Sequence, residues 1–398
     1  MIKLFLVFLR LGLTSFGGPV AHLAFFRAEF VDRRNWMSEK DYADLVALCQ
    51  FLPGPASSQV GLAVGYYRHS YGGALAAWLG FTLPSALLMV LFAIGINHYE
   101  IPAGALLGLK LVAIAVVAQA IWGMGRSFCS RLNTFLIAFL AALILVFFPN
   151  YMVQLATILL GAIVGRLLFK GGVVISTEQL DDDKLRPEKT DNLTTSRSVA
   201  ILLLSVFIFL LLGLPILVSQ TSNQELALFD IFYRVGSLVF GGGHVVLPML
   251  QAELVPQGLV SSDQFLAGYG AVQAVPGPLF TFAGFLGATT TTISNPWLGG
   301  LLCLLAIFLP SFLLVFACLP YWDTLRKKSS IQQALTGANA AVVGILAAAF
   351  VNPLLIKTVS TPLHIIVTLL AFIALQKFKL PPWAVVIVGA LFGALVFR

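Results

Sequence analysis

Residues 50–55 read QFLPGP and residues 273–278 read QAVPGP, and each stretch lies inside a long apolar segment. Proline removes a backbone donor and ends a helix, while glycine permits a tight turn. Pro-Gly-Pro at such a place therefore predicts a discontinuous helix whose second part begins within the bilayer. The new helix start presents unpaired N–H groups and the positive end of a helix dipole, which suit an anion.

The composition around these breaks is that of a membrane protein. Of the 398 residues, 59% are hydrophobic and 10% are charged, and the mean hydropathy is +0.94. A span needs about 20 apolar residues, and the chain offers about thirteen such segments. They are 4–26, 42–66, 72–97, 101–123, 132–148, 151–169, 199–219, 226–250, 263–289, 296–320, 331–351, 361–376 and 381–397. Because the runs are continuous rather than alternating, we expect an all-α polytopic membrane protein.

An internal repeat relates the two halves of the chain. The pattern Arg-x-Gly-x-x-x-Phe-Gly-Gly begins at Arg10 and again at Arg234, and later motifs follow in the same order. The paired positions include Glu29 with Glu253, Ser38 with Ser261, Leu83-Pro84-Ser85 with Leu309-Pro310-Ser311, and Gly108 with Gly337. We predict a first repeat at 1–170 and a second at 226–398. Residues 171–225 would form a polar cytoplasmic linker and one connecting transmembrane helix.

Basic residues in the loops predict the orientation. Counted through thirteen spans, fifteen Lys and Arg residues fall on one side and six on the other, and such residues concentrate on the cytoplasmic side. We therefore expect a cytoplasmic N-terminus, a C-terminus on the opposite side, and repeats of inverted topology. The basic loop at 27–40 is an exception. If the broken segments are re-entrant hairpins rather than full spans, the number of crossings changes and this count of basic residues supports the orientation less strongly.

Three basic residues remain inside predicted spans, namely Arg10, Lys110 and Arg234. A charge within the bilayer is costly, so it is functional or paired by default. Arg10 and Arg234 share one repeat position, which predicts two guanidiniums facing a central cavity, where their donors suit an oxyanion. The alternative is that each reaches an interface or pairs with an acidic residue. Lys110 is either a third ligand or a structural partner of an acid.

The predicted substrate site gathers the residues of the helix breaks. Its members are Arg10, Phe16, Gly17, Gly18, Gln50, Pro53, Gly54, Pro55, Ser57, Ser58, Arg234, Phe240, Gly241, Gly242, Gln273, Pro276, Gly277 and Pro278. Polar side chains follow the first Pro-Gly-Pro and apolar ones the second, so we expect an asymmetric site. The alternative for Phe-Gly-Gly is close helix packing by small residues.

Four further residues are candidates for carrying a coupling proton. His22 and His244 follow the Phe-Gly-Gly breaks, and histidine titrates near neutral pH. Glu29 and Glu253 match in the repeat. The alternatives are satisfied polar groups for the histidines and charges at the membrane interface for the glutamates. Ser38 and Ser261 resemble helix caps.

Enzyme motifs are missing from the sequence. No Walker loop, HExxH, GxSxG or dinucleotide fingerprint occurs, so we expect no enzyme activity, no cofactor, no metal site and no nucleic acid partner. Energy would come from an ion gradient, or flow would be downhill. The sequence leaves the oligomeric state open, including a homo-oligomer.

These motifs resemble those of the chromate ion transporter family in its long two-domain form. The similar stretches are FGGP at 16–19, QFLPGPASSQVG at 50–61, GFTLPS at 80–85, FGGGHVVLPML at 240–250, QAVPGPLFTFAGFLGA at 273–288 and GANAAVVGIL at 337–346. The resemblance implies an inner-membrane protein that exports chromate with the proton motive force and gives chromate resistance. Some relatives are linked to sulfate. Uptake of sulfate or another oxyanion, or an anion channel, are the alternatives, because chromate and sulfate are both tetrahedral dianions.

Overall fold

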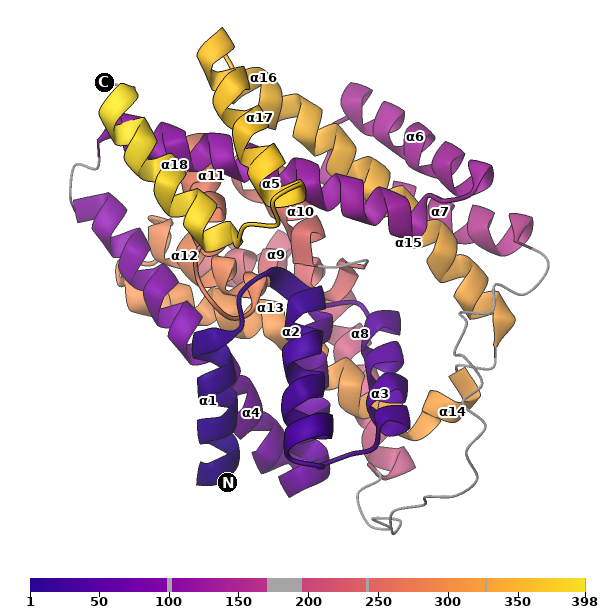
Figure 1. The fold of residues 1–398 in the computed structure, drawn as a ribbon. Coiled ribbons are helices and arrows are strands. Elements are labelled where there is room, and N and C mark those ends of the chain that lie inside the picture. The colour runs from indigo at the N-terminus through magenta and orange to yellow at the C-terminus, as the bar shows by residue number, and fades with distance from the viewer. Residues whose placement is uncertain (99–101, 170–194, 241–242, 326–327, 398) are drawn as a thin grey trace.

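A computed structural model describes residues 1–98, 102–169, 195–240, 243–325 and 328–397 (Figure 1). These residues form helices and loops and contain no strand. The first half comprises α1 (Ile2–Thr14), α2 (Gly18–Arg27), the π-helix η1 (Ala28–Arg33), α3 (Glu39–Phe51), α4 (Ala56–His98), α5 (Ala103–Phe128), α6 (Leu132–Phe147) and α7 (Tyr151–Leu168). Of the region 171–225 that was predicted as linker and connecting helix, residues 171–194 lie outside the described residues.

The second half follows a connecting helix, α8 (Arg197–Gln220). It comprises α9 (Gln224–Leu238), η2 (Gly243–Val245), α10 (Val246–Leu254), α11 (Ser262–Val272), η3 (Leu279–Thr281), α12 (Phe282–Thr289), α13 (Pro296–Cys318), η4 (Leu319–Tyr321), α14 (Trp322–Leu325), α15 (Ser329–Ala349), η5 (Phe350–Leu355), α16 (Ile356–Thr358), α17 (Pro362–Gln376) and α18 (Pro382–Val396).

Length and hydropathy make this a multi-pass membrane protein, as predicted. Six helices of the described part are long and apolar enough to cross a bilayer, and four shorter apolar helices accompany them. On α8, large apolar side chains such as Phe209 and Leu212 are more than 60% exposed, which suits lipid rather than water. The all-α fold class is therefore confirmed.

The predicted helix breaks are present. Phe-Gly-Gly separates α1 from α2, and the first Pro-Gly-Pro separates α3 from α4. The second Pro-Gly-Pro likewise separates α11 from η3 and α12. Ser38 and Ser261 cap α3 and α11, each accepting a backbone N–H at 3.1 Å. The predicted caps are thus confirmed, and both helices that lead into the breaks have fixed starting points.

Reciprocal packing relates the two repeats. Within each half, a glycine lets the first helix approach a carbonyl of a later one: Gly12 lies against Phe81, and Gly236 against Ile307. Between the halves, α5 packs on α18 and α15 packs on α7, and both crossings are built on glycine faces. When two halves are related by a two-fold axis, each contact between them occurs twice, with the roles of the two halves exchanged. The repeats are interleaved and meet at the helix breaks.

Among the described residues, one contact is not matched by an equally extensive one in the other half. Helix α11 packs against α5, with Gly270 beside the carbonyl of Leu109. Its counterpart α3 packs mainly on α4 and α2, and Figure 1 shows it at the lower front, with α15 in the upper right. The two repeats therefore differ in how the helix before Pro-Gly-Pro is held.

Candidate functional site

Each Pro-Gly-Pro break is hydrogen-bonded to the first helix of the opposite repeat. The amide of Gly54 donates to the carbonyl of Val239 at 2.8 Å, and the amide of Gly277 donates to the carbonyl of Ser15 at 3.0 Å. Ser15 and Val239 are fully buried and directly follow α1 and α9. Two reciprocal bonds thus join four chain breaks at the centre of the protein.

The serines of the two Leu-Pro-Ser motifs line the same centre. A β-carbon at Gly54 would lie 2.7 Å from the hydroxyl of Ser311, and one at Gly277 would lie 2.7 Å from that of Ser85. Both glycines have positive φ, +116° and +105°, where other residues are strained. Glycine is therefore required at each position for two reasons, the backbone conformation and the lack of space for a side chain.

Gln59 ties the first break to the second repeat. Its side-chain amide donates to the carbonyl of Pro53 at 2.7 Å and lies 3.4 Å from the hydroxyl of Ser311. Because the carbonyl of Pro53 can only accept, the NH2 group must face it. The amide oxygen of Gln59 is left buried without a partner among the described residues.

Several other buried polar atoms of the first repeat also have no partner among the described residues. They include the hydroxyls of Ser15, Ser58 and Thr82 and Nε2 of His22. Nδ1 of His22 lies 3.3 Å from the hydroxyl of Ser57. A buried polar group without a hydrogen bond is costly, so such a group is expected to have a function or a ligand. Hydroxyls and an imidazole N–H are donors that suit an oxyanion.

The second repeat contributes apolar side chains at the matching place. Phe280 and Phe282 are buried, and the hydroxyl of Thr281 donates to the carbonyl of Pro278 at 2.8 Å. His244 has a different partner from His22, because its Nδ1 lies 2.8 Å from the hydroxyl of Tyr269. Nε2 of Gln273 and the amide atoms of Gln251 are also buried without a partner among the described residues, so the second half adds two amide side chains to these apolar groups.

The structure does not give the two matched arginines equal surroundings. Arg234 forms ion pairs with Asp230 at 2.8 Å and with Glu253 at 3.1 Å. Arg10 is exposed, and no ion pair involves it in the described part of the chain. These ion pairs favour the alternative that Arg234 pairs with an acidic residue, and two guanidiniums facing one cavity stay a prediction. Leu6 stands where the second repeat has Asp230.

Glu29 and Lys110 also lie in ion pairs. Glu29 accepts from Arg33 at 3.0 Å and from Arg34 at 2.6 Å. Burial acts to raise the pKa of Glu29, but the hydrogen bonds from these arginines outweigh it, so the pKa lies below the ordinary value. Lys110 contacts Asp263 of α11 at 2.7 Å. Lys110 is thus a structural partner of an acid, the second of the two alternatives.

The remaining predicted residues lie around the centre or at its edge. Pro55, Pro276 and Pro278 are buried, Phe16, Gly18, Pro53, Phe240 and Gln273 are half-buried, and Gly17 and Gln50 are exposed. Gly241 and Gly242 lie outside the described residues. The described part contains no group of three or more His, Cys, Asp or Glu residues that could hold a metal ion.

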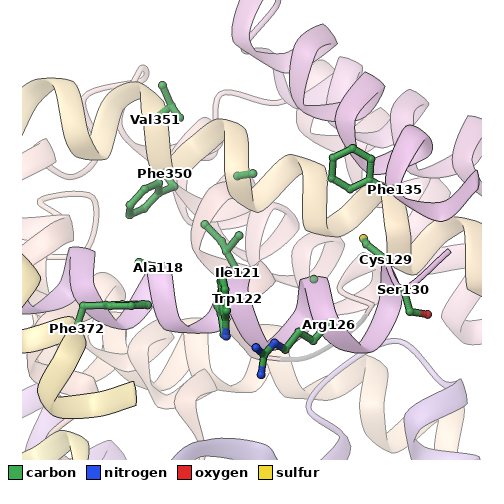
Figure 2. A pocket seen from close by; sticks show the side chains of 12 residues that line it. Ala118, Ile121, Trp122, Arg126, Cys129, Ser130, Phe135, Phe350, Val351 and Phe372 are labelled. Carbon is green, nitrogen blue, oxygen red and sulfur yellow. The ribbon is translucent and has the colours of Figure 1, made fainter. Parts of the chain in front are cut away.

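A groove of the described residues lies away from this centre. A groove of about 760 Å³ runs between α5, α6, α15 and α17, with Trp122 and Arg126 on one wall and Phe372 at one end (Figure 2). Its lining is apolar apart from Arg126 and Ser130. Such walls suit lipid chains rather than a dianion, so this groove is not the candidate site.

Comparison with known proteins agrees with the motifs. The family model described as chromate transporter matches residues 2–166 and 226–394. The chain belongs to the chromate transporter family. A chromate transport protein of Pseudomonas aeruginosa is 27% identical over 408 residues, covering 99% of this chain and 92% of the relative.

Two further relatives align over similar lengths. An uncharacterized transporter of Methanocaldococcus jannaschii is 26% identical over 400 residues, covering 99% of this chain and 94% of the relative. A chromate transport protein of Cupriavidus metallidurans is 25% identical, covering 99% and 92%. No solved structure matches the chain.

Sequence analysis missed three residues of this centre. Ser85 and Ser311 were visible as a matched pair in the Leu-Pro-Ser motifs, but their closeness to the opposite glycines depends on how the repeats dock. Asp230 was also visible, since it lies four residues before Arg234 and such residues face each other on a helix.

Proposed function

We propose that this protein is a secondary transporter that exports chromate across the inner membrane, driven by the proton motive force, and so gives chromate resistance. The observation that carries the proposal is the buried centre where the broken helices of both repeats are hydrogen-bonded to each other. Broken helices in matching positions of two repeats mark the binding sites of secondary transporters. Membership of the chromate transporter family supports the substrate.

Chromate is a tetrahedral dianion with four acceptor oxygens, so its site must supply donors. The N-terminus of α4 begins at Ala56, directly after the first break, and adds its dipole to the hydroxyl of Ser58. If the hydroxyl of Ser57 donates to Nδ1 of His22, Nε2 of the ring carries the proton and becomes another donor. The first repeat would then bind the anion, and the second would supply an apolar wall.

We assign the difference between α11 and α3 to alternating access. On one side of the centre, α11 is held against α5, and Lys110 and Asp263 form an ion pair there. Gln264 adds a 3.3 Å hydrogen bond to Asn97. In the opposite state α3 would pack on α15, and the contact of α11 with α5 would open. This exchange uses the predicted inverted repeats, 1–170 and 226–398, with a cytoplasmic N-terminus and the C-terminus on the other side.

The test is chromate accumulation in everted membrane vesicles with an imposed pH gradient. We expect accumulation that collapses when the gradient is removed, and at least a tenfold loss of the initial rate in Ser58→Ala. Ser130→Ala, an exposed serine outside the centre, is the matched control and should match the wild type.

Other outcomes would refute parts of this proposal. Accumulation of sulfate but not chromate, or movement only into cells, would indicate an oxyanion uptake system. A flux that does not saturate and never exceeds the electrochemical gradient would indicate an anion channel. Normal transport by Ser58→Ala would remove that residue from the site.

A further inference from the structure

Arg234 forms a buried cluster of three charged residues with Asp230 and Glu253. Its Nε atom lies 2.8 Å from Oδ2 of Asp230, and a terminal nitrogen lies 3.1 Å from Oε1 of Glu253. The side chains of Asp230 and Glu253 are only 4% and 10% exposed, and that of Arg234 is 16% exposed. The guanidinium also lies 4.8 Å from the ring centre of Tyr151 on α7.

The cluster has one negative charge more than it has positive charges. Two carboxylates share a single guanidinium, which stays protonated in proteins. Among the described residues, the elements packed around the cluster place no second cation beside it: α13 and α15 carry no charged residue, and α8 carries only Arg197 at its exposed start. The basic residue of α7, Arg166, lies about four turns along the helix from Tyr151, and Asp263 of α11 is paired with Lys110. The other groups near the cluster are neutral, namely Tyr151 and Gln257, whose amide lies 3.3 Å from Glu253.

One carboxylate oxygen in the cluster lacks a protein partner. Oδ1 of Asp230 is buried and accepts no hydrogen bond from the described residues. An uncompensated negative charge in a low-dielectric interior is costly, and binding one proton would remove it. A metal ion would need more oxygen ligands than these two carboxylates provide.

The first repeat does not contain this cluster. Leu6 replaces Asp230 at the matching position, Arg10 is exposed without an ion pair, and Glu29 is held by other arginines. A structural ion pair needed to hold a repeat together would be expected in both halves. The single occurrence points to a task that the transporter performs once per cycle.

Helix α9 links the cluster to the centre. Asp230 and Arg234 lie on α9, which ends one turn later at Leu238, and the carbonyl of the next residue, Val239, accepts the amide of Gly54. Glu253 lies on α10, beyond the Phe-Gly-Gly break. Loss of charge on one carboxylate would loosen the connection of α10 to α9 next to that hydrogen bond.

We propose that Asp230 and Glu253, sharing Arg234, form the binding site of the transported proton. This inference rests on the proposed proton-coupled transport and assigns its coupling site. The proton binds to one carboxylate oxygen while the site faces one side of the membrane, and it leaves from the same oxygen on the other side.

The test separates coupling from transport. Asp230→Asn and Glu253→Gln should lower chromate accumulation driven by a pH gradient at least tenfold. Exchange of labelled for unlabelled chromate without a gradient should stay within about twofold of the wild type, because the substrate site is intact. Glu225→Gln, an exposed carboxylate on the same helix, should change neither measurement.

A second readout does not depend on chromate. In purified protein, infrared difference spectra between high and low pH should show a protonated carboxyl band that Asp230→Asn or Glu253→Gln removes or shifts. Unchanged gradient-driven accumulation, or equal loss of accumulation and exchange in folded variants, would overturn the proposal. So would an unaltered carboxyl band, or accumulation that follows a sodium gradient instead. If the wild type shows the carboxyl band but no chromate exchange, chromate is refuted as the substrate and the proposed proton site still stands.

Discussion

The contact between Gly277 and Ser85 gives the sharpest test of how the repeats meet. In Gly277→Ala the new β-carbon would lie 2.7 Å from the serine hydroxyl and 3.3 Å from the carbonyl of Phe81. A non-glycine residue at positive φ costs about 1–2 kcal/mol, and overpacking adds about 1–3 kcal/mol. We therefore expect a loss of about 2–5 kcal/mol, at a residue whose amide also bonds to Ser15.

The matched control is Gly258→Ala. Gly258 also has a positive φ, +72°, but a β-carbon there would meet nothing within 4 Å, so only the backbone cost of about 1–2 kcal/mol applies. The double variant Gly277→Ala/Ser85→Ala removes the clashing hydroxyl. It should recover about 1–2 kcal/mol relative to the sum of the single variants, because residues in contact are not additive.

The assay measures both stability and function. Thermal unfolding of purified protein in detergent reports the free energy, and everted vesicles report the initial rate of chromate accumulation. We expect more than a tenfold lower rate in Gly277→Ala, because the clash lies between the two repeats, and less than a threefold change in Gly258→Ala, which lies at an exposed turn. Equal effects of the two single variants, or no recovery in the double variant, would refute the cross-repeat contact.

Three further predictions concern charges and helix crossings. Arg234→Ala leaves two buried carboxylates without a partner and should destabilise the protein by about 3–5 kcal/mol, whereas Arg10→Ala, at an exposed position, should stay within about 0.5 kcal/mol; thermal unfolding compares them. Lys110→Met removes an ion pair whose acid is 77% exposed, so it should lower the stability by less than about 1 kcal/mol. It should nevertheless alter the rate of chromate accumulation, and an unchanged rate would contradict the proposal that this ion pair holds α11 against α5. Gly108→Ala places a β-carbon against the carbonyl of a glycine in α18 and should destabilise by about 1–3 kcal/mol, while Gly123→Ala on the same helix meets nothing and should be neutral or slightly stabilising.

Local sequence chemistry was enough to predict the breaks and their caps. Pro-Gly-Pro ends a helix by itself, and Ser38 and Ser261 cap the helices three residues before their partners, so neither feature needs distant contacts. The repeat could also be read from the motifs. What the sequence could not give is the docking of the repeats, because the bonds from Gly54 and Gly277 reach carbonyls that lie far away in the chain.

The arginines show a different limit of sequence analysis. Their equal repeat positions suggested equal roles, yet the acid four residues before Arg234 has no counterpart before Arg10. The arginine that lies four residues after aspartate is buried and ion-paired, whereas the arginine that lies four residues after leucine is exposed. Repeat alignment identifies equivalent places, whereas the neighbours within one helical turn decide their chemistry.

The interleaving of the repeats has a consequence for biosynthesis. Helix α5 leaves the ribosome early, but its partner α18 is the last helix of the described chain, about 250 residues later. At about 5–20 residues per second, the glycine face of α5 waits roughly 13–50 seconds in the membrane before its partner arrives. During this interval the face of α5 that will contact α18 has no partner, so a truncated chain that lacks α18 would present a half-assembled protein to the quality-control proteases of the membrane.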